Sequence, residues 1–133
     1  MLNYELLERL CGEILECGGS VRWSGIANRT GVILAQSTRA GTPLLLTDEE
    51  NEEYAASAIA RQKTRGKYEP KIGRLEYACG RYEKLVRATI PLTENLYLLL
   101  TFDPAETEFD SIISKRIWQR ISTYADALMQ MTY

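Results

Sequence analysis

The spacing of apolar residues divides the first part of the chain into one helix and two strands. Residues 2–17 carry leucines and isoleucines at the three- and four-residue spacing of an amphipathic helix, and Gly18 and Gly19 follow as an end signal. Residues 21–28 and 32–37 alternate between two faces and are joined by a short turn that contains glycine. This pattern predicts a helix followed by a β-hairpin.

A middle helix is predicted over residues 48–64. Thr47 suits the N-cap position and Glu50 lies three residues later, as in a capping box. Acidic residues crowd its first turns and basic residues its last, which is the arrangement that the helix dipole favours. Its apolar stripe is thin and consists of Tyr54, Ala55, Ala58 and Ile59. Small side chains on this stripe would allow a close approach to a sheet or to a second copy of the helix.

The last part of the chain predicts three strands and a long helix. Residues 72–79 and 82–90 alternate between apolar and polar positions, whereas residues 96–102 are apolar on both faces. A strand that is apolar on both faces belongs in the interior of a sheet that is covered on both sides, so the two half-polar strands are expected nearer an edge. Residues 108–129 keep a 3.6-residue apolar repeat and predict the strongest helix.

This order of elements predicts an α+β fold of topology α-ββ-α-βββ-α. Short connections make the five strands antiparallel, and the doubly apolar last strand takes the centre, which gives the strand order 2-1-5-4-3. The middle helix then covers one face and the terminal helices the other. No internal repeat or linker interrupts the chain, so residues 1–133 are expected to form a single domain.

Composition argues against most catalytic chemistry. The 133 residues include 16 Lys and Arg against 18 Asp and Glu, a net charge of −2, and contain no histidine, which excludes imidazole-based catalysis and histidine metal ligands. The three cysteines form no Cys-x-x-Cys pair, and no phosphate-binding loop or Gly-x-Ser-x-Gly motif is present. The acidic residues between 103 and 110 lack the EF-hand spacing. We therefore expect a protein that is not an enzyme, with no catalytic, metal or cofactor site.

Charge and hydropathy bear on the cellular location of the protein and on the ligands it could bind. The sequence opens without a signal-peptide pattern and has no apolar run long enough to span a membrane, so a cytoplasmic location is expected. Residues 61–87 hold nine basic residues against three acidic ones. This stretch is compatible with a site for single-stranded nucleic acid or an acidic partner, although it lacks an RNA-binding motif. We favour a solvated surface there and expect no nucleic-acid ligand.

Residues 25–36, Gly-Ile-Ala-Asn-Arg-Thr-Gly-Val-Ile-Leu-Ala-Gln, resemble the opening hairpin of the roadblock/LC7 domain, which has a profilin-like fold. Asn-Arg-Thr-Gly stands where that family commonly has Asp-x-x-Gly. The chain is also similar to a group of small archaeal proteins of unassigned function, in residues 25–31, 44–47 and 102–113. The roadblock resemblance implies a non-enzymatic dimer that scaffolds or regulates small GTPases, motors or receptor complexes.

The resemblance also implies where two copies would meet. Family dimers often join through the edge strand and the middle helix, which here gives the candidate interface Tyr54, Ala55, Ala58, Ile59, Ile72, Arg74, Glu76 and Tyr77. The alternative function is a PAS- or GAF-like sensor that binds a small ligand between the sheet and the middle helix. A sensor needs a cavity beneath that helix, whereas a scaffold packs Ala55 and Ala58 tightly.

Overall fold

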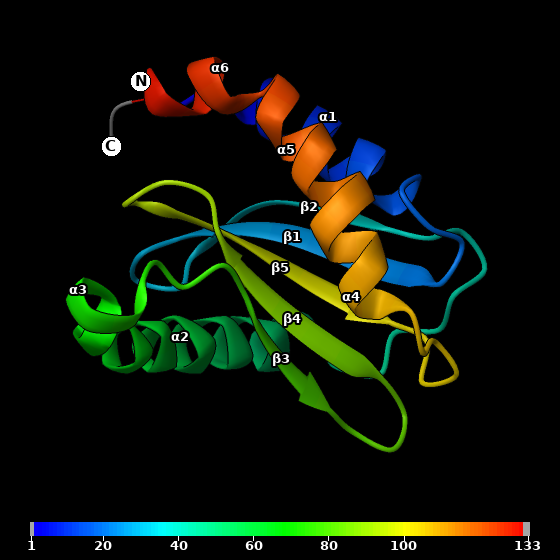
Figure 1. Ribbon diagram of the computed structural model, residues 1–133. Coiled ribbons are helices and arrows are strands. Elements are labelled where there is room, and N and C mark those ends of the chain that lie inside the picture. The colour runs from blue at the N-terminus through cyan, green and yellow to red at the C-terminus, as the bar shows by residue number, and fades with distance from the viewer. Residues whose placement is uncertain (1, 132–133) are drawn as a thin grey trace.

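A single antiparallel sheet lies between two helical layers in the computed structural model, which describes residues 2–131 (Figure 1). The strand order is β2-β1-β5-β4-β3, and β5 pairs with β1 on one side and β4 on the other. The predicted order and the interior position of the last strand are confirmed. The strands are β1 (Val21–Asn28), β2 (Ile33–Thr38), β3 (Ala78–Arg81), β4 (Val86–Pro91) and β5 (Leu96–Phe102).

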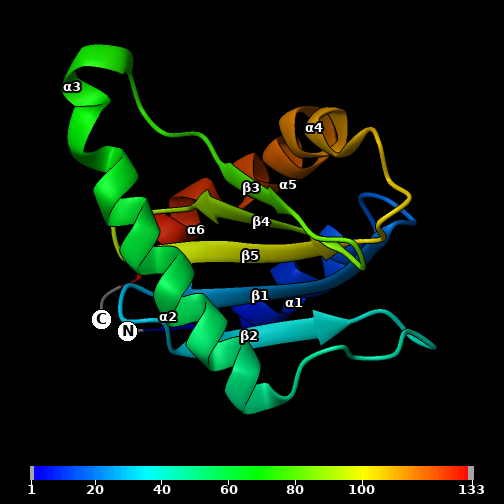
Figure 2. The same ribbon diagram turned by 90° about the horizontal axis from the view of Figure 1, so that it is seen from below.

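The helices divide between the two faces of the sheet as predicted. The N-terminal helix and the C-terminal helical segments lie together on one face, and the long middle helix crosses the other face (Figures 1 and 2). The helical elements are α1 (Tyr4–Leu15), α2 (Asp48–Arg65), η1 (Gly66–Tyr68), α3 (Glu69–Ile72), α4 (Phe109–Ser111), η2 (Ile112–Ile117), α5 (Trp118–Thr123) and α6 (Ala125–Met129).

The larger core lies between the sheet and the terminal helices. Alternate residues of β5 point into it, because successive side chains of a strand face opposite sides of a sheet. Large aliphatic side chains of α1 and of the C-terminal helix fill the space opposite, and burying each one removes enough apolar surface from water to stabilise the fold by about 1.5–3 kcal/mol. The fully buried members include Leu7, Leu10, Ile14, Ile26, Ile90, Leu96, Leu98, Leu100, Phe102 and Ile113.

A smaller core lies beneath α2. It is formed by Trp23, Ala27, Leu99, Ala55, Ala58 and Ile59. The two alanines let the helix approach the sheet closely, as their size in the sequence suggested. The indole of Trp23 extends over Gly25, where a Cβ atom would lie only 2.6 Å from the ring. The backbone of Gly31, at φ +94°, comes so near α2 that a Cβ atom there would lie 2.5 Å from Cα of Ala56.

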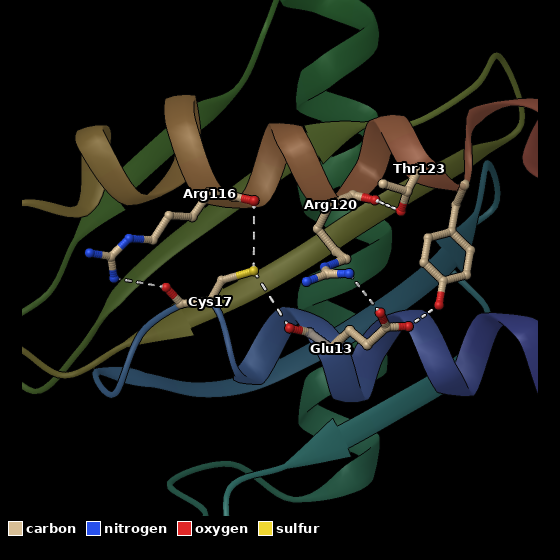
Figure 3. Close-up of polar contacts among 6 residues, drawn as sticks. Glu13, Cys17, Arg116, Arg120 and Thr123 are labelled. Atoms are coloured by element: carbon tan, nitrogen blue, oxygen red, sulfur yellow. Dashed lines mark hydrogen bonds and ion pairs between the residues drawn. The ribbon is translucent and has the colours of Figure 1, made fainter.

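Polar contacts fasten the C-terminal helix to the end of α1 (Figure 3). The carboxylate of Glu13 lies 3.0 Å from Nη1 of Arg120 and also accepts a hydrogen bond from the hydroxyl of Tyr124. One turn earlier in the C-terminal helix, Arg116 donates from Nη1 to the carbonyl of Cys17 at 3.1 Å. On the inner side, half-buried Trp118 contacts the larger core. The two ends of the chain therefore form one layer.

The C-terminal helix is less regular than its apolar repeat predicted over 108–129. A π-helical turn occupies η2, and the helix breaks at Tyr124, where φ is −105° and ψ is 0°. Just before the break, Ser122 and Thr123 turn their hydroxyls back to the carbonyls of Trp118 and Arg120. Such bonds bend helices, which gives a physical reason for the break that apolar periodicity does not reveal.

The two half-polar strand predictions, 72–79 and 82–90, were placed too early. Residues 69–72 form the helical turn α3, with Pro70 in its first turn, and Gly73 follows at φ +94°. The strand therefore begins only at Ala78. The predicted turn at Gly80 lies inside β3, and the hairpin turns instead over 82–85. The buried sequence of β4 begins at Val86, opposite Phe102 of β5, and this pairing sets its register.

Candidate functional site

Buried polar side chains gather on the face of the sheet that α2 covers. They come from α2 itself, from β4 and from β5, and they are Asn51, Gln62, Arg87, Thr89 and Thr101. Gln62 donates from Nε2 to the carbonyl of Thr89 at 3.2 Å, while its Oε1 atom finds no hydrogen-bond partner in the part of the chain that the structure describes. The layer beneath α2 is therefore apolar toward β1 and polar toward β4.

Arg87 is the charged group of this layer, and only 3% of it is exposed. Its guanidinium carbon lies 3.5 Å from the centroid of the Tyr54 ring and 6.0 Å from that of Trp23. Its Nη2 atom lies 3.5 Å from Oδ1 of Asn51, and its Nε atom is buried without a hydrogen-bond partner among residues 2–131. Desolvation by burial lowers the pKa of Arg87, and the neighbouring tyrosines oppose that shift.

No carboxylate of residues 2–131 forms an ion pair with Arg87. The ion pairs in this range join Arg22 to Asp103 and Arg120 to Glu13. A buried cation is normally paired with an anion, because burial without one costs several kcal/mol, on the order of 3–5 when a partner is removed. The face of an aromatic ring offsets about 2 kcal/mol of that cost when the contact is desolvated. Arg87 therefore lies in a site that is electrostatically incomplete.

A groove of about 510 Å³ runs past Arg87 at the side of α2. Its wall is mainly apolar and consists of Leu45, Leu46, Tyr54, Tyr82, Glu83, Lys84, Leu85 and Arg87. The rim is open to solvent, since Leu45 is 47% exposed and Tyr82 54%. Beside it lies a hollow of about 280 Å³ that is lined by Arg87, by Arg61 and Arg65, and by residues of β3. This side of α2 is therefore apolar with a basic floor.

The outward surface of α2 carries an ordered row of charges. Glu49, Glu53, Ser57, Arg61 and Arg65 follow one another at four-residue intervals, and all are exposed. Residues four apart lie along one ridge that winds by about 40° per step, so the row turns from the outward side at Glu49 toward β3 at Arg65. The row therefore has two acids on one side of a central serine and two bases on the other. We call it the charge row of α2.

The capping box predicted at the start of α2 is confirmed. Thr47 accepts a hydrogen bond from the backbone of Glu50 at 3.1 Å, and Glu50 accepts one in return from the backbone of Thr47 at 2.9 Å. This pair fixes the helix start and hence the position of the charge row.

Three residues of the predicted dimer interface lie inside the chain itself. Ala55, Ala58 and Ile59 are 0%, 2% and 1% exposed, because they face the sheet of their own chain. Tyr54 is half-buried and covers Arg87. The tight packing of Ala55 and Ala58 against the sheet is the arrangement expected of a scaffold, whereas a sensor would need a cavity between Ala58 and the sheet.

The other four predicted interface residues do not share a strand. Ile72 is 81% exposed in α3, and Arg74 and Glu76 are exposed in the irregular segment that follows. Tyr77 is half-buried and donates a hydrogen bond to Asp110. The structure thus separates these residues from the buried stripe of α2, and a dimer interface stays a prediction.

Two kinds of feature are absent from the part of the chain that the structure describes. Residues 2–131 contain no group of three or more Cys, Asp or Glu side chains placed to hold a metal ion. Over the same residues, no helix combines the length and the apolar character that a membrane crossing requires.

Sequence reasoning did not single out Arg87. A signal was present, because Arg87 and Thr89 fall on one face of a strand whose other face is apolar. Charged residues at alternate positions of a strand are more typical of a solvated face. What the sequence does not show is that α2 covers this face and that Arg87 has no anion beside it among residues 2–131.

The sheet order and the helical layers are those of a roadblock/LC7-like, profilin-like fold. An MglB structure with a tetrameric arrangement is 16% identical with a TM-score of 0.76, over 95% of this chain and 91% of that one. The gliding protein MglB from Thermus thermophilus is 17% identical with a TM-score of 0.73, over 96% and 95%. A roadblock/LC7 domain from Streptomyces avermitilis is 9% identical with a TM-score of 0.72, over 93% and 98%.

The chain belongs to DUF6659, a family of unknown function whose model matches residues 1–129. No curated protein matches the sequence. At identities below 20% the likeness to the solved structures shows the fold alone.

Proposed function

We propose that this protein is a non-enzymatic interaction module that works as a homodimer and scaffolds or regulates a signalling complex. The observation that carries the proposal is the charge row of α2. In an antiparallel pairing about a two-fold axis at Ser57, Glu53 and Arg61 flank the axis on the helix face that Ser57 occupies, so Glu53 of one copy would lie beside Arg61 of the other. The same surface on both copies is then complementary to itself, as a two-fold interface requires.

The edge of the sheet supports the same assembly. Within the described residues β3 is an edge strand that pairs with β4, so its outer side presents unpaired backbone donors and acceptors. The hollow that contains Arg61 and Arg65 also borders Ala78, Cys79 and Gly80 of β3, which places the basic half of the charge row beside this edge. One partner surface would thus cover both the basic half of the charge row and the edge of β3. We therefore place the proposed interface on the charge row and β3, and not on the buried alanines.

The kind of partner follows from the roadblock resemblance. That resemblance implies scaffolds and regulators of small GTPases, and the MglB neighbour with a tetrameric arrangement is itself an assembly of several chains. We infer that a dimer of this protein binds a small GTPase or another component of a signalling complex. Binding of the purified dimer to small GTPases of the same organism, in both nucleotide states, tests this part of the proposal.

Two charge-reversed variants test the dimer. One carries Glu53→Lys, and the other carries Arg61→Glu. Each variant alone places like charges opposite one another and should sediment as a monomer, while an equal mixture should form a heterodimer because every facing pair is again opposite in sign. Analytical ultracentrifugation at several concentrations measures the three cases.

Circular dichroism of each variant serves as the control for folding. A wild-type chain that stays monomeric on concentrating would reject the homodimer. A dimer that neither variant disrupts would show that two copies meet on a different surface.

A further inference from the structure

The groove beside α2 combines a buried positive charge with apolar walls. Arg87 has no ion-pair partner within residues 2–131, and its Nε atom is buried without a hydrogen bond. An unpaired donor of this kind gains free energy when an acceptor reaches it, and a carboxylate gains most because both partners are charged. The missing group is therefore an anion.

The walls indicate what the anion is attached to. Leu45, Leu46 and Leu85 line the groove together with Tyr82, and the rim residues Leu45 and Tyr82 are about half exposed. Sites for small molecules usually bury 70–90% of the ligand's surface, roughly, which this open groove does not provide. Exposed apolar patches of this type are common where another protein binds. The walls fit apolar side chains on either side of an acidic residue.

The charges around the groove agree with an acidic ligand. Lys84 lies in the same wall, so the two cations of the groove, Lys84 and Arg87, outnumber its single acid, Glu83. Such a field attracts acidic segments and repels basic ones.

We propose that Arg87 and this groove form a docking site for an Asp or Glu side chain flanked by apolar residues in a segment of a partner protein. The proposal rests on the proposed function as an interaction module but does not depend on the dimer. In the bound state the carboxylate would take the place of the missing acceptor, and the flanking side chains would cover Leu45 and Leu85.

Two synthetic peptide pools test the site on the full chain. Both are acetylated and amidated and carry Leu, Phe or Tyr on each side of a central residue, which is Glu in one pool and Gln in the other. We expect the Glu pool to shift the Nε–H resonance of Arg87 and the methyl resonances of Leu45 and Leu85 in NMR spectra. The Gln pool should bind at least about tenfold more weakly, since it lacks the charge.

Two variants locate the effect. Arg87→Met keeps an apolar stem of similar length and should remove the preference for Glu over Gln. Leu45→Asp changes an exposed rim residue, so the fold is retained, and its carboxylate should weaken binding of the Glu pool by repulsion. Leu45→Ser is the matched control without charge and should weaken both pools equally. If Arg87→Met fails to fold, the comparison of Leu45→Asp with Leu45→Ser still tests the docking site.

The outcomes are separable from those of the dimer test. Equal binding of both pools, or no shift at Arg87 with either, would overturn the docking site. A shift of Arg87 by free acetate as large as that by the Glu pool, with Leu45 and Leu85 unmoved, would overturn it as well, because it would show a simple anion site. Ultracentrifugation of the same samples measures the oligomeric state. Peptide binding by a monomeric protein would therefore reject the proposed dimer and leave the docking site supported.

Discussion

The guanidinium carbon of Arg87 lies 3.5 Å from the centre of the Tyr54 ring, so a cation–π contact joins β4 to the helix that covers it. The contact lies where the apolar layer under α2 gives way to the polar one. It keeps a buried charge tolerable without an anion, and it makes Tyr54 part of both the fold and the groove.

Removing the ring over Arg87 should destabilise the fold. We expect Tyr54→Ala to lower the free energy of unfolding by about 2 kcal/mol, because a desolvated cation–π contact is lost. Tyr54→Phe keeps the aromatic face and should lose much less. Urea unfolding followed by circular dichroism measures both. Equal losses in the two variants would mean that the hydroxyl, and not the ring face, supports Arg87.

The inner and outer alanines of α2 should respond in opposite ways to a bulky charge. Ala58→Arg forces a guanidinium between helix and sheet and should cost at least about 3 kcal/mol of stability. Ala60→Arg, on the exposed side, should change stability by no more than about 0.5 kcal/mol. Thermal melts of the two variants measure the difference, and an intact fold in Ala58→Arg would contradict the buried position.

Gly31 should be far less tolerant of a side chain than Gly41. Both have positive φ, +94° and +77°, so alanine strains the backbone at either site. Only at Gly31 would the new Cβ atom collide with Ala56 of α2, whereas nothing lies within 4 Å of it at Gly41. We expect Gly31→Ala to cost about 2 kcal/mol more than Gly41→Ala. Chemical denaturation of the pair checks this, and equal costs would show that α2 can move away from the turn.

The thiol of Cys11 should make stability fall at alkaline pH. Burial raises its pKa from 9.0 to about 12, so the folded state holds the proton more tightly than the unfolded state. The resulting stabilisation is complete below pH 9.0 and is lost as the pH rises toward about 12, with a slope of up to about 1.4 kcal/mol per pH unit. The difference in unfolding free energy between wild type and Cys11→Ala, measured across this range, isolates the effect. A difference independent of pH would contradict it.

The fold was predictable because its decisive signals are local. Residues 96–102 are apolar on both faces, and this alone fixes β5 in the interior with helices on both sides. The Thr47 capping box gave the start of α2 correctly. The predicted bounds of the edge strand were wrong because polar and apolar residues alternate through 72–77 as they would in a strand. In the structure, Pro70 and the positive φ of Gly73 bend the chain before a strand can begin.

The candidate site was less accessible to sequence reasoning. Ala55 and Ala58 indicated a close contact, but a small residue packs equally well against its own sheet or a second copy, and the structure shows the sheet. Arg87 looked like a solvent-facing charge, because its burial depends on Tyr54, more than 30 residues earlier in the chain. Pairings between distant segments decide which polar residues become buried.

The two tryptophans give each layer of the molecule its own optical reporter. Trp23 lies under α2 and Trp118 in the C-terminal helix on the opposite side of the sheet. With one of them replaced by phenylalanine, the fluorescence of the other follows the detachment of a single layer. With Trp118 replaced, the fluorescence of Trp23 would show whether α2 lifts from the sheet when the neighbouring groove is filled, without a signal from the layer that contains α1.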